Sequence, residues 1–97
     1  MNKFYKKEEA NLSGIYKISN ILNDKVYIGS TTSFRKRLSN HKSKLLKNKS
    51  DSIKLQNFVN KYGYDKLNFE IIEKCTVKEL IEREQYFIDF YDSFDNG

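Results

Sequence analysis

Five polar side chains in this sequence are of the types that hydrolysis of a phosphodiester requires. The reaction needs a group that activates water, a cation that stabilises charge on the phosphoryl oxygens, and a means of neutralising the leaving oxygen. The chain offers two phenols, a guanidinium, an imidazole and a carboxylate suited to a hard metal ion. These candidates are Tyr16, Tyr27, Arg37, His41 and Glu84.

Glu84 is the most informative of the five, because it falls within the apolar face of the last predicted helix. A carboxylate is expensive to desolvate unless something compensates its charge. Three compensations are open: an internal Arg or Lys partner, protonation, or a divalent cation. The expected apolar face consists of Val77, Leu80, Ile81, Phe87, Ile88 and Tyr91.

The other candidates have structural alternatives of their own. A buried tyrosine is usually a core residue whose hydroxyl has a partner, and an ordinary phenol, with a pKa near 10, is a poor base at neutral pH. His41 lies on an apolar stripe as well as on a basic edge of its predicted helix, so it would also suit a core position. Arg37, in a basic helix, would also contact solvent or a backbone phosphate.

The element that must carry both tyrosines is a β-hairpin. Residues 11–20 and 25–30 alternate over short runs, and the Asn and Asp between them tolerate turn geometry. On the pleat, Tyr16 points opposite to Ile15, and Tyr27 points opposite to both of its neighbours. The two phenols are therefore expected together on one face of the hairpin.

Two helices are expected next, and the first carries the nitrogen side chains. After the hairpin, Arg37, His41 and Lys44 recur at i, i+4 and i+7, so they share one edge of a helix. A second helix is predicted from a cap at residues 51–52 to a stop at Gly63.

The remaining residues complete the fold class. Residues 67–74 alternate in hydrophobicity and predict a third strand. Thr76 and Glu79 have the spacing of a capping box, which opens the last helix. The order β-β-α-α-β-α indicates an α+β domain with a small three-stranded antiparallel sheet flanked by helices.

Composition restricts the class of protein further. The 97 residues suffice for one domain, and the single cysteine, Cys75, excludes an internal disulfide and a four-cysteine zinc site. No apolar run approaches the roughly 20 residues of a membrane span. We therefore expect a cytoplasmic, intracellular protein with no membrane and no disulfide-linked partner.

The net charge of +5 is unevenly distributed. Residues 34–61 hold nine Lys or Arg and one acidic residue, whereas residues 62–97 hold four Lys or Arg and nine acidic residues. The middle segment is therefore the expected contact for a polyanion, although a solvated helical face is the alternative. The side chains expected to contact DNA are Arg35, Lys36, Lys42, Lys44 and Lys54.

The tripeptides "GIY" at residues 14–16 and "YIG" at residues 27–29 resemble the signature of the GIY-YIG nuclease family. Downstream, an Arg and a His four residues apart and a Glu within "ERE" fall where the family has them: here Arg37, His41 and Glu84. The similarity runs from residue 14 to the end of the chain. Within it, "SIKLQNFVNKYG" resembles more narrowly the phage and intron-encoded homing endonucleases of the family.

The resemblance implies cleavage of double-stranded DNA with Mg²⁺ or Mn²⁺ as cofactor, on the fold predicted above. It also implies a role for each candidate and a bare backbone at Gly14 and Gly29. Tyr16, with a pKa lowered by nearby positive charge, would activate or orient water, and Tyr27 would bind the scissile phosphate or support Tyr16. Arg37 would stabilise the charge on the phosphate, and His41 would accept a proton or a hydrogen bond. Glu84 would hold the metal.

The resemblance divides the chain into an N-terminal extension, residues 1–13, and a catalytic domain, residues 14–97. Homing members have a Gly-Tyr-Asn motif after the last helix, whereas this sequence ends in "FDNG". We therefore expect a domain excised from a longer protein with a separate DNA-recognition region. The alternatives are a restriction or repair nuclease, a non-catalytic DNA-binding module on the same fold, and a protein-interaction domain.

Overall fold

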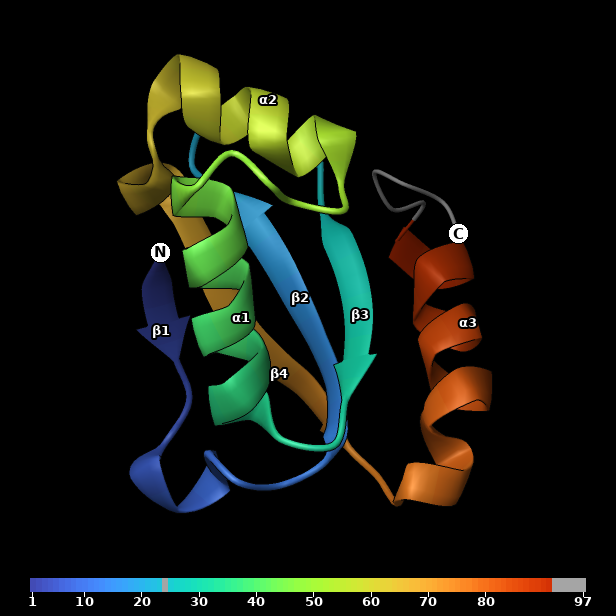
Figure 1. The fold of residues 1–97 in the computed structure, drawn as a ribbon. Coiled ribbons are helices and arrows are strands. Elements are labelled where there is room, and N and C mark those ends of the chain that lie inside the picture. Colours follow the sequence, from blue (N-terminus) through green and yellow to red (C-terminus); the bar gives the residue numbers. More distant parts are fainter. Residues whose placement is uncertain (24, 92–97) are drawn as a thin grey trace.

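The computed structural model describes residues 1–23 and 25–91, which form a sheet with helices on both faces (Figure 1). Four strands lie in the order β1-β4-β2-β3. The predicted α+β class is confirmed. The strands are β1 (Asn2–Phe4), β2 (Gly14–Asn20), β3 (Tyr27–Thr31) and β4 (Leu67–Lys74), and the helices are α1 (Phe34–Leu46), α2 (Ile53–Tyr62) and α3 (Leu80–Tyr91).

The predicted hairpin is formed by β2 and β3, and its register sets the direction of both tyrosines. Tyr16 lies opposite Gly29, and Ile18 lies opposite Tyr27. Residues that pair across two strands share a face of the sheet. The two phenols therefore lie on one face, as expected, with ring centroids 6.5 Å apart.

The turn of this hairpin is organised by Asn20 at the end of β2. Its side-chain oxygen accepts hydrogen bonds from the backbone N–H groups of Leu22 and Asn23, both at 2.8 Å. An asparagine side chain thereby replaces a backbone carbonyl in turning the chain. Asp24, which was expected in the same turn, lies outside the described residues.

The prediction of a three-stranded, wholly antiparallel sheet is wrong, because β1 adds a fourth strand that runs parallel to β4. All three residues of β1 are exposed, so no alternation of polar and apolar residues marked it in the sequence. Backbone pairing holds it, together with the Asn2 side chain, which donates to Asn68 Oδ1 at 3.0 Å and to the Asp65 carbonyl at 3.3 Å.

The segment between β1 and β2 supports the start of α1. The carbonyl oxygens of Ala10 and Leu12 accept hydrogen bonds from the backbone N–H groups of Arg35 and Phe34, at 2.7 and 3.2 Å. The first N–H groups of a helix have no partner within the helix. Residues 1–13, expected as an extension, thus contribute both a strand and a cap for α1.

The second helix begins and ends at the predicted signals, and the first helix begins with the same kind of cap. The Ser33 hydroxyl accepts from the Lys36 N–H at 3.5 Å, and the Ser52 hydroxyl accepts from the Leu55 N–H at 3.2 Å. Each serine therefore caps a helix N-terminus. Gly63 ends α2 with a φ of +105°, which side chains with a Cβ rarely adopt.

The last helix follows its predicted capping box after one 3₁₀ turn, but its apolar face is narrower than expected. Leu80 and Ile88 are buried, whereas Val77 and Ile81 are 61% and 86% exposed. The helix lies beside the edge strand β3 rather than across the middle of the sheet (Figure 1). None of the helices described for residues 1–23 and 25–91 has the length and apolar composition to cross a membrane.

The two faces of the sheet have separate cores. The face covered by α1 and α2 buries a large aromatic and aliphatic cluster, in which Tyr16 stacks on Phe69 with centroids 4.8 Å apart. The face towards α3 buries a smaller aliphatic cluster around Ile15 and Ile28. Neighbouring residues of β2 belong to different cores. The side chains of this strand that alternate between the two faces of the sheet are therefore buried on both faces.

Candidate active site

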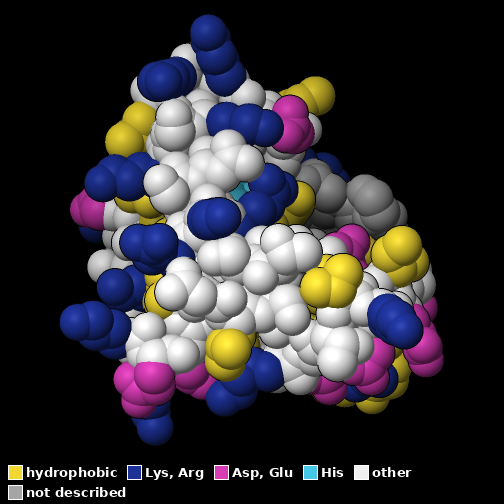
Figure 2. Space-filling model, turned by 60° about the horizontal axis from the view of Figure 1, so that its bottom comes forward, with side chains coloured by type: hydrophobic (Ala, Val, Ile, Leu, Met, Phe, Trp, Pro, Cys, Tyr) yellow, Lys and Arg dark blue, Asp and Glu magenta, His cyan; other side chains and the backbone are white. Residues whose placement is uncertain are grey.

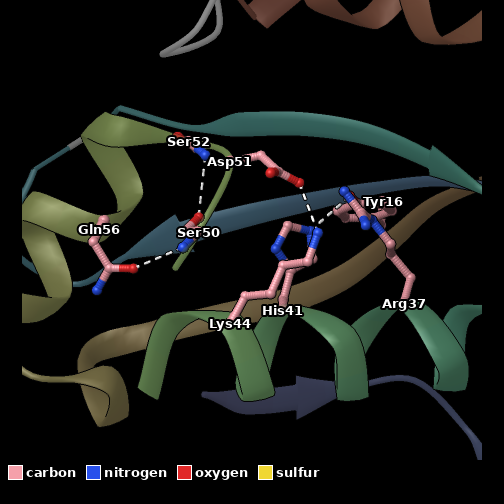
Figure 3. Close-up of polar contacts among 8 residues, drawn as sticks. All are labelled: Tyr16, Arg37, His41, Lys44, Ser50, Asp51, Ser52 and Gln56. Atoms are coloured by element: carbon pink, nitrogen blue, oxygen red, sulfur yellow. Dashed lines mark hydrogen bonds and ion pairs between the residues drawn. The ribbon is translucent and has the colours of Figure 1, made fainter. Parts of the chain in front are cut away.

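Tyr16 is the centre of a buried hydrogen-bonded cluster between β2 and α1. Its side chain has no exposed surface. Arg37 Nε donates a hydrogen bond to Tyr16 Oη at 3.0 Å, and Tyr16 Oη lies 2.8 Å from His41 Nε2. Figure 3 shows Arg37 and His41 projecting from successive turns of α1 towards the phenol. The predicted spacing of four residues is what brings both groups to one hydroxyl.

The charges around this cluster define where its protons lie. Burial, together with the nearby cations of Arg37 and Lys44, lowers the pKa of His41 to about 3, so the imidazole is neutral at pH 7. Arg37 can only donate, which leaves the Tyr16 proton free to be donated to a neutral His41 Nε2. The cluster thus forms a chain of donors that runs from guanidinium to phenol to imidazole.

The pKa of Tyr16 is higher than expected from the sequence. Burial raises it above its ordinary value, and the nearby Arg37 guanidinium lowers it by less. The prediction that positive charge would lower this pKa is therefore wrong for the free protein, because desolvation of the phenolate outweighs the one cation beside it. Tyr16 is a neutral phenol at pH 7, covered by Arg37.

Tyr27 and Gly29 complete the surroundings of the phenol. The rings of Tyr27 and His41 meet edge to face, with centroids 5.8 Å apart. Burial lowers the pKa of Arg37, but the Tyr16 and Tyr27 phenols more than offset this, so its pKa lies above the ordinary value. A Cβ on Gly29 would overlap the Tyr16 hydroxyl and ring, so this glycine leaves room for the phenol.

Gly14, which was expected near the site, has a different role. A Cβ at this position would overlap the carbonyl of Glu73 in β4 and lie 2.8 Å from Phe34 Cζ. The bare backbone of Gly14 thus allows close approach of β4 and of the first residue of α1. It acts on the site only through the placement of α1.

Glu84 lies on the other face of the sheet from Tyr16, at the edge strand β3. Its side chain is half-buried, and its Oε1 accepts a short hydrogen bond from the Ser30 hydroxyl. The ion pairs found within residues 1–23 and 25–91 do not involve it; the adjacent Arg83 instead binds Glu73 at 2.5 and 2.8 Å. The negative charge of Glu84 still reaches Tyr16 and contributes to raising its pKa.

Ser30 was not predicted as a site residue, although the sequence contained the signal. It follows "YIG" directly, and on the pleat it points opposite to Gly29, towards α3. The prediction considered only the face that carries the tyrosines. The side chain of Ser30 connects the hairpin to the helix that carries Glu84.

The side chains of this site offer one carboxylate ligand for a hard divalent cation. Among the described residues, no three His, Cys, Asp or Glu side chains gather into a cluster that would hold a metal by themselves. Mg²⁺ is commonly held by one or two carboxylates together with waters and substrate phosphate oxygens. One half-exposed carboxylate with a neutral hydroxyl partner meets the protein's part of that requirement.

Basic side chains surround this site on the surface. Figure 2 shows Lys and Arg side chains on the same face as the chain's one histidine, while acidic side chains lie mainly towards the margins. The residues expected to contact DNA lie on α1 and α2: Arg35, Lys36, Lys42 and Lys54 are exposed, and Lys44 is half-buried beside Asp51.

A family model described as the GIY-YIG catalytic domain matches residues 12–96. Intron-associated endonuclease 1 of Enterobacteria phage T4 is 42% identical over 87 residues, which are 88% of this chain and 35% of that protein. The probable intron-encoded endonuclease 1 of Neurospora crassa is 39% identical over 83 residues, 86% of this chain and 26% of that protein. The chain thus spans about a third or less of these curated relatives.

Solved structures extend the similarity to the fold. The catalytic domain of the homing endonuclease I-TevI has a TM-score of 0.79 and 41% identity, covering 88% of this chain and 94% of that chain. A mutant of the same catalytic domain has a TM-score of 0.80 and 41% identity, covering 89% of this chain and 90% of that chain. The observed arrangement of sheet and helices is therefore shared with a nuclease domain.

Proposed function

Because this chain belongs to the GIY-YIG family, whose nucleases are generally dependent on divalent metal ions, we propose that it cleaves double-stranded DNA with Mg²⁺ or Mn²⁺. The observation that carries the proposal is the cluster in which Arg37 and His41 both contact the Tyr16 hydroxyl, combined with a carboxylate on the opposite face of the sheet that has no ion-pair partner among the described residues. A module that only bound DNA would need the cations but not this cluster.

In the proposed reaction, Arg37 neutralises charge on the scissile phosphate. Its guanidinium covers the Tyr16 hydroxyl in the free protein, so binding of a phosphate by Arg37 uncovers the phenol. A preorganised cation beside developing phosphoryl charge stabilises the transition state more than the ground state. Tyr27, which lies beside the same guanidinium, supports this placement or binds the phosphate itself.

Tyr16 and His41 carry the proton of the attacking water. The raised pKa excludes a phenolate as the starting base at pH 7, so Tyr16 accepts the water proton while its own proton passes to His41 Nε2, 2.8 Å away. The phosphate charge beside His41 raises the pKa of the imidazole and favours this transfer. Glu84 would hold the divalent cation, which supplies charge stabilisation for the phosphate and the leaving oxygen.

The first test is nicking of supercoiled plasmid with Mg²⁺, Mn²⁺ or EDTA, with Tyr16→Phe run beside the parent chain. We expect nicking that requires metal and that falls by about 10²-fold or more in Tyr16→Phe, the range of a lost acid–base group. Tyr62→Phe, on the exposed side of α2, is the matched control and should leave the rate unchanged. DNA binding without nicking under every condition would instead support the non-catalytic module.

The homing type is the part of the proposal that names a biological role. It is supported by the two curated relatives, which are intron-associated or intron-encoded endonucleases, and by the likeness to a homing endonuclease domain. Restriction and repair roles remain the alternatives. The expectation about the Gly-Tyr-Asn motif concerns residues 94–97, which lie outside the described residues.

A further inference from the structure

Asp51 places a negative charge at the rim of the proposed active site. It is the one acidic residue within the basic segment 34–61. Its Oδ2 lies 2.8 Å from Lys44 Nζ, and its side chain is 78% exposed. Figure 3 shows the carboxylate reaching from the connection between α1 and α2 to the side of His41.

The carboxylate is not needed to begin α2, although Asp51 was one of two expected caps. The Ser52 hydroxyl caps that helix, and the preceding turn is held by Ser50, whose N–H donates to Gln56 Oε1 at 3.0 Å and whose hydroxyl accepts from the Ser52 N–H at 3.1 Å. Among the described residues, the Asp51 side chain is therefore bonded to Lys44 and takes no part in this network.

The surrounding cations keep Asp51 charged. Lys44 contributes most to a lowered pKa of the carboxyl, and the Arg37 guanidinium contributes less. Since Arg37 is the proposed phosphate ligand, the carboxylate stands within reach of the charge that a bound DNA phosphate would bring. A phosphate and this carboxylate would repel each other and would compete for the same lysine.

We propose that Asp51 occupies, in the free protein, the position of a DNA phosphate against Lys44, and that bound DNA displaces it. This inference rests on the proposed function, because it assumes that the basic face binds DNA. Lys44 is then held in place before binding, and the affinity for DNA is lower than the basic segment alone would give. Asp51 is thus an affinity-determining residue outside the cleavage chemistry.

The test is binding of a duplex oligonucleotide in EDTA at several salt concentrations. Asp51→Asn removes one negative charge from the DNA footprint and leaves Lys44 unpaired, so affinity at low salt should rise about twofold to fivefold, and the slope of log K against log salt should steepen by about 0.9. Glu82→Gln is the matched control: it makes the same charge change at an exposed position on α3, away from the basic segment, and should change neither quantity.

A double-mutant cycle with Lys44→Gln tests displacement itself. If DNA breaks the ion pair, Lys44→Gln weakens binding more in the Asp51→Asn background than in the parent, by up to about fivefold. An equal loss in both backgrounds would overturn the inference, because the pair would then persist on DNA. The inference would also be overturned if Asp51→Asn had the same DNA affinity and salt slope as Glu82→Gln. If binding by the parent chain did not depend on salt, both the inference and the proposed function would be overturned.

Discussion

On the α1 face of the sheet the polar groups are buried and bonded to one another, whereas on the α3 face a half-exposed carboxylate is held by one hydroxyl. Tyr16 and His41 are almost fully buried and satisfied within the protein. Glu84 keeps part of its surface open and accepts a hydrogen bond from the Ser30 hydroxyl. The groups proposed to transfer protons are thus preorganised and closed, while the carboxylate proposed to hold the metal is open to an external ligand.

The largest effect is expected on the open face, from Glu84→Gln. Loss of the metal-binding carboxylate should lower cleavage by about 10³-fold or more, because a bound cation contributes several kcal/mol to transition-state stabilisation. The free energy of unfolding should change by less than about 1 kcal/mol, since Glu84 is only half-buried and forms no ion pair with the described residues. Plasmid nicking and urea denaturation measure the two quantities.

If Glu84→Gln unfolded the domain, the carboxylate would be a structural residue, and the contrast between the two faces would fail. Glu82→Gln is the control for a general effect of charge on α3, because Glu82 lies two residues before Glu84 and is exposed. It should leave both nicking and stability as in the parent.

Arg37→Ala should have the next largest effect and tests the closed face. We expect cleavage to fall by about 10²- to 10³-fold with little change in DNA affinity, because the guanidinium is aimed at developing charge rather than at docking. Arg35→Ala is the contrasting variant: its exposed side chain on the same helix should weaken DNA binding and not the single-turnover rate. Equal loss of binding in both variants would make Arg37 a docking residue.

Ser30→Ala tests how Glu84 is held. Removing the hydroxyl leaves the carboxylate in place but less constrained, so cleavage should fall by about tenfold, and Mn²⁺ binding measured by calorimetry in the presence of uncleaved DNA should weaken by a similar factor. Ser30→Thr, which keeps the hydroxyl, should restore both quantities. If Ser30→Thr were as impaired as Ser30→Ala, the hydrogen bond would not be what holds Glu84.

The last prediction concerns the free energy of unfolding of the closed face in acid rather than cleavage. His41 has a folded pKa of about 3, below the value near 6.5 expected when unfolded, so the unfolded chain binds the extra proton between these values. The stability that comes from the neutral imidazole is therefore fully present above pH 6.5 and is lost as the pH falls towards 3, by about 1 kcal/mol per pH unit.

The measurement is urea denaturation of the parent and of His41→Gln from pH 7 to pH 4. Carboxylates with lowered pKa values, such as Glu79, also lose stability in acid, but they do so in both proteins. The difference between the two curves therefore isolates His41. Parallel curves would mean that the imidazole is more open to solvent than the structure indicates.

The sequence by itself determined most of the local structure and the identity of the candidate groups. Alternation in the hairpin put both tyrosines on one face, spacing of four residues put Arg37 and His41 on one edge of α1, and serine and glycine marked the helix ends. These signals are local, because caps, turns and side-chain periodicity depend on neighbours within a few residues.

Only the tertiary structure decided how those groups are placed in relation to one another. The pKa of Tyr16, the strand β1 and the partner of Glu84 all depend on segments far apart in the sequence. The pKa of a buried group depends on desolvation by every segment packed around it. The exposed residues of β1 pair through their backbone groups, and backbone pairing leaves no pattern of side chains in the sequence. That is why the candidate residues could be selected from the sequence, whereas their closed and open surroundings could not.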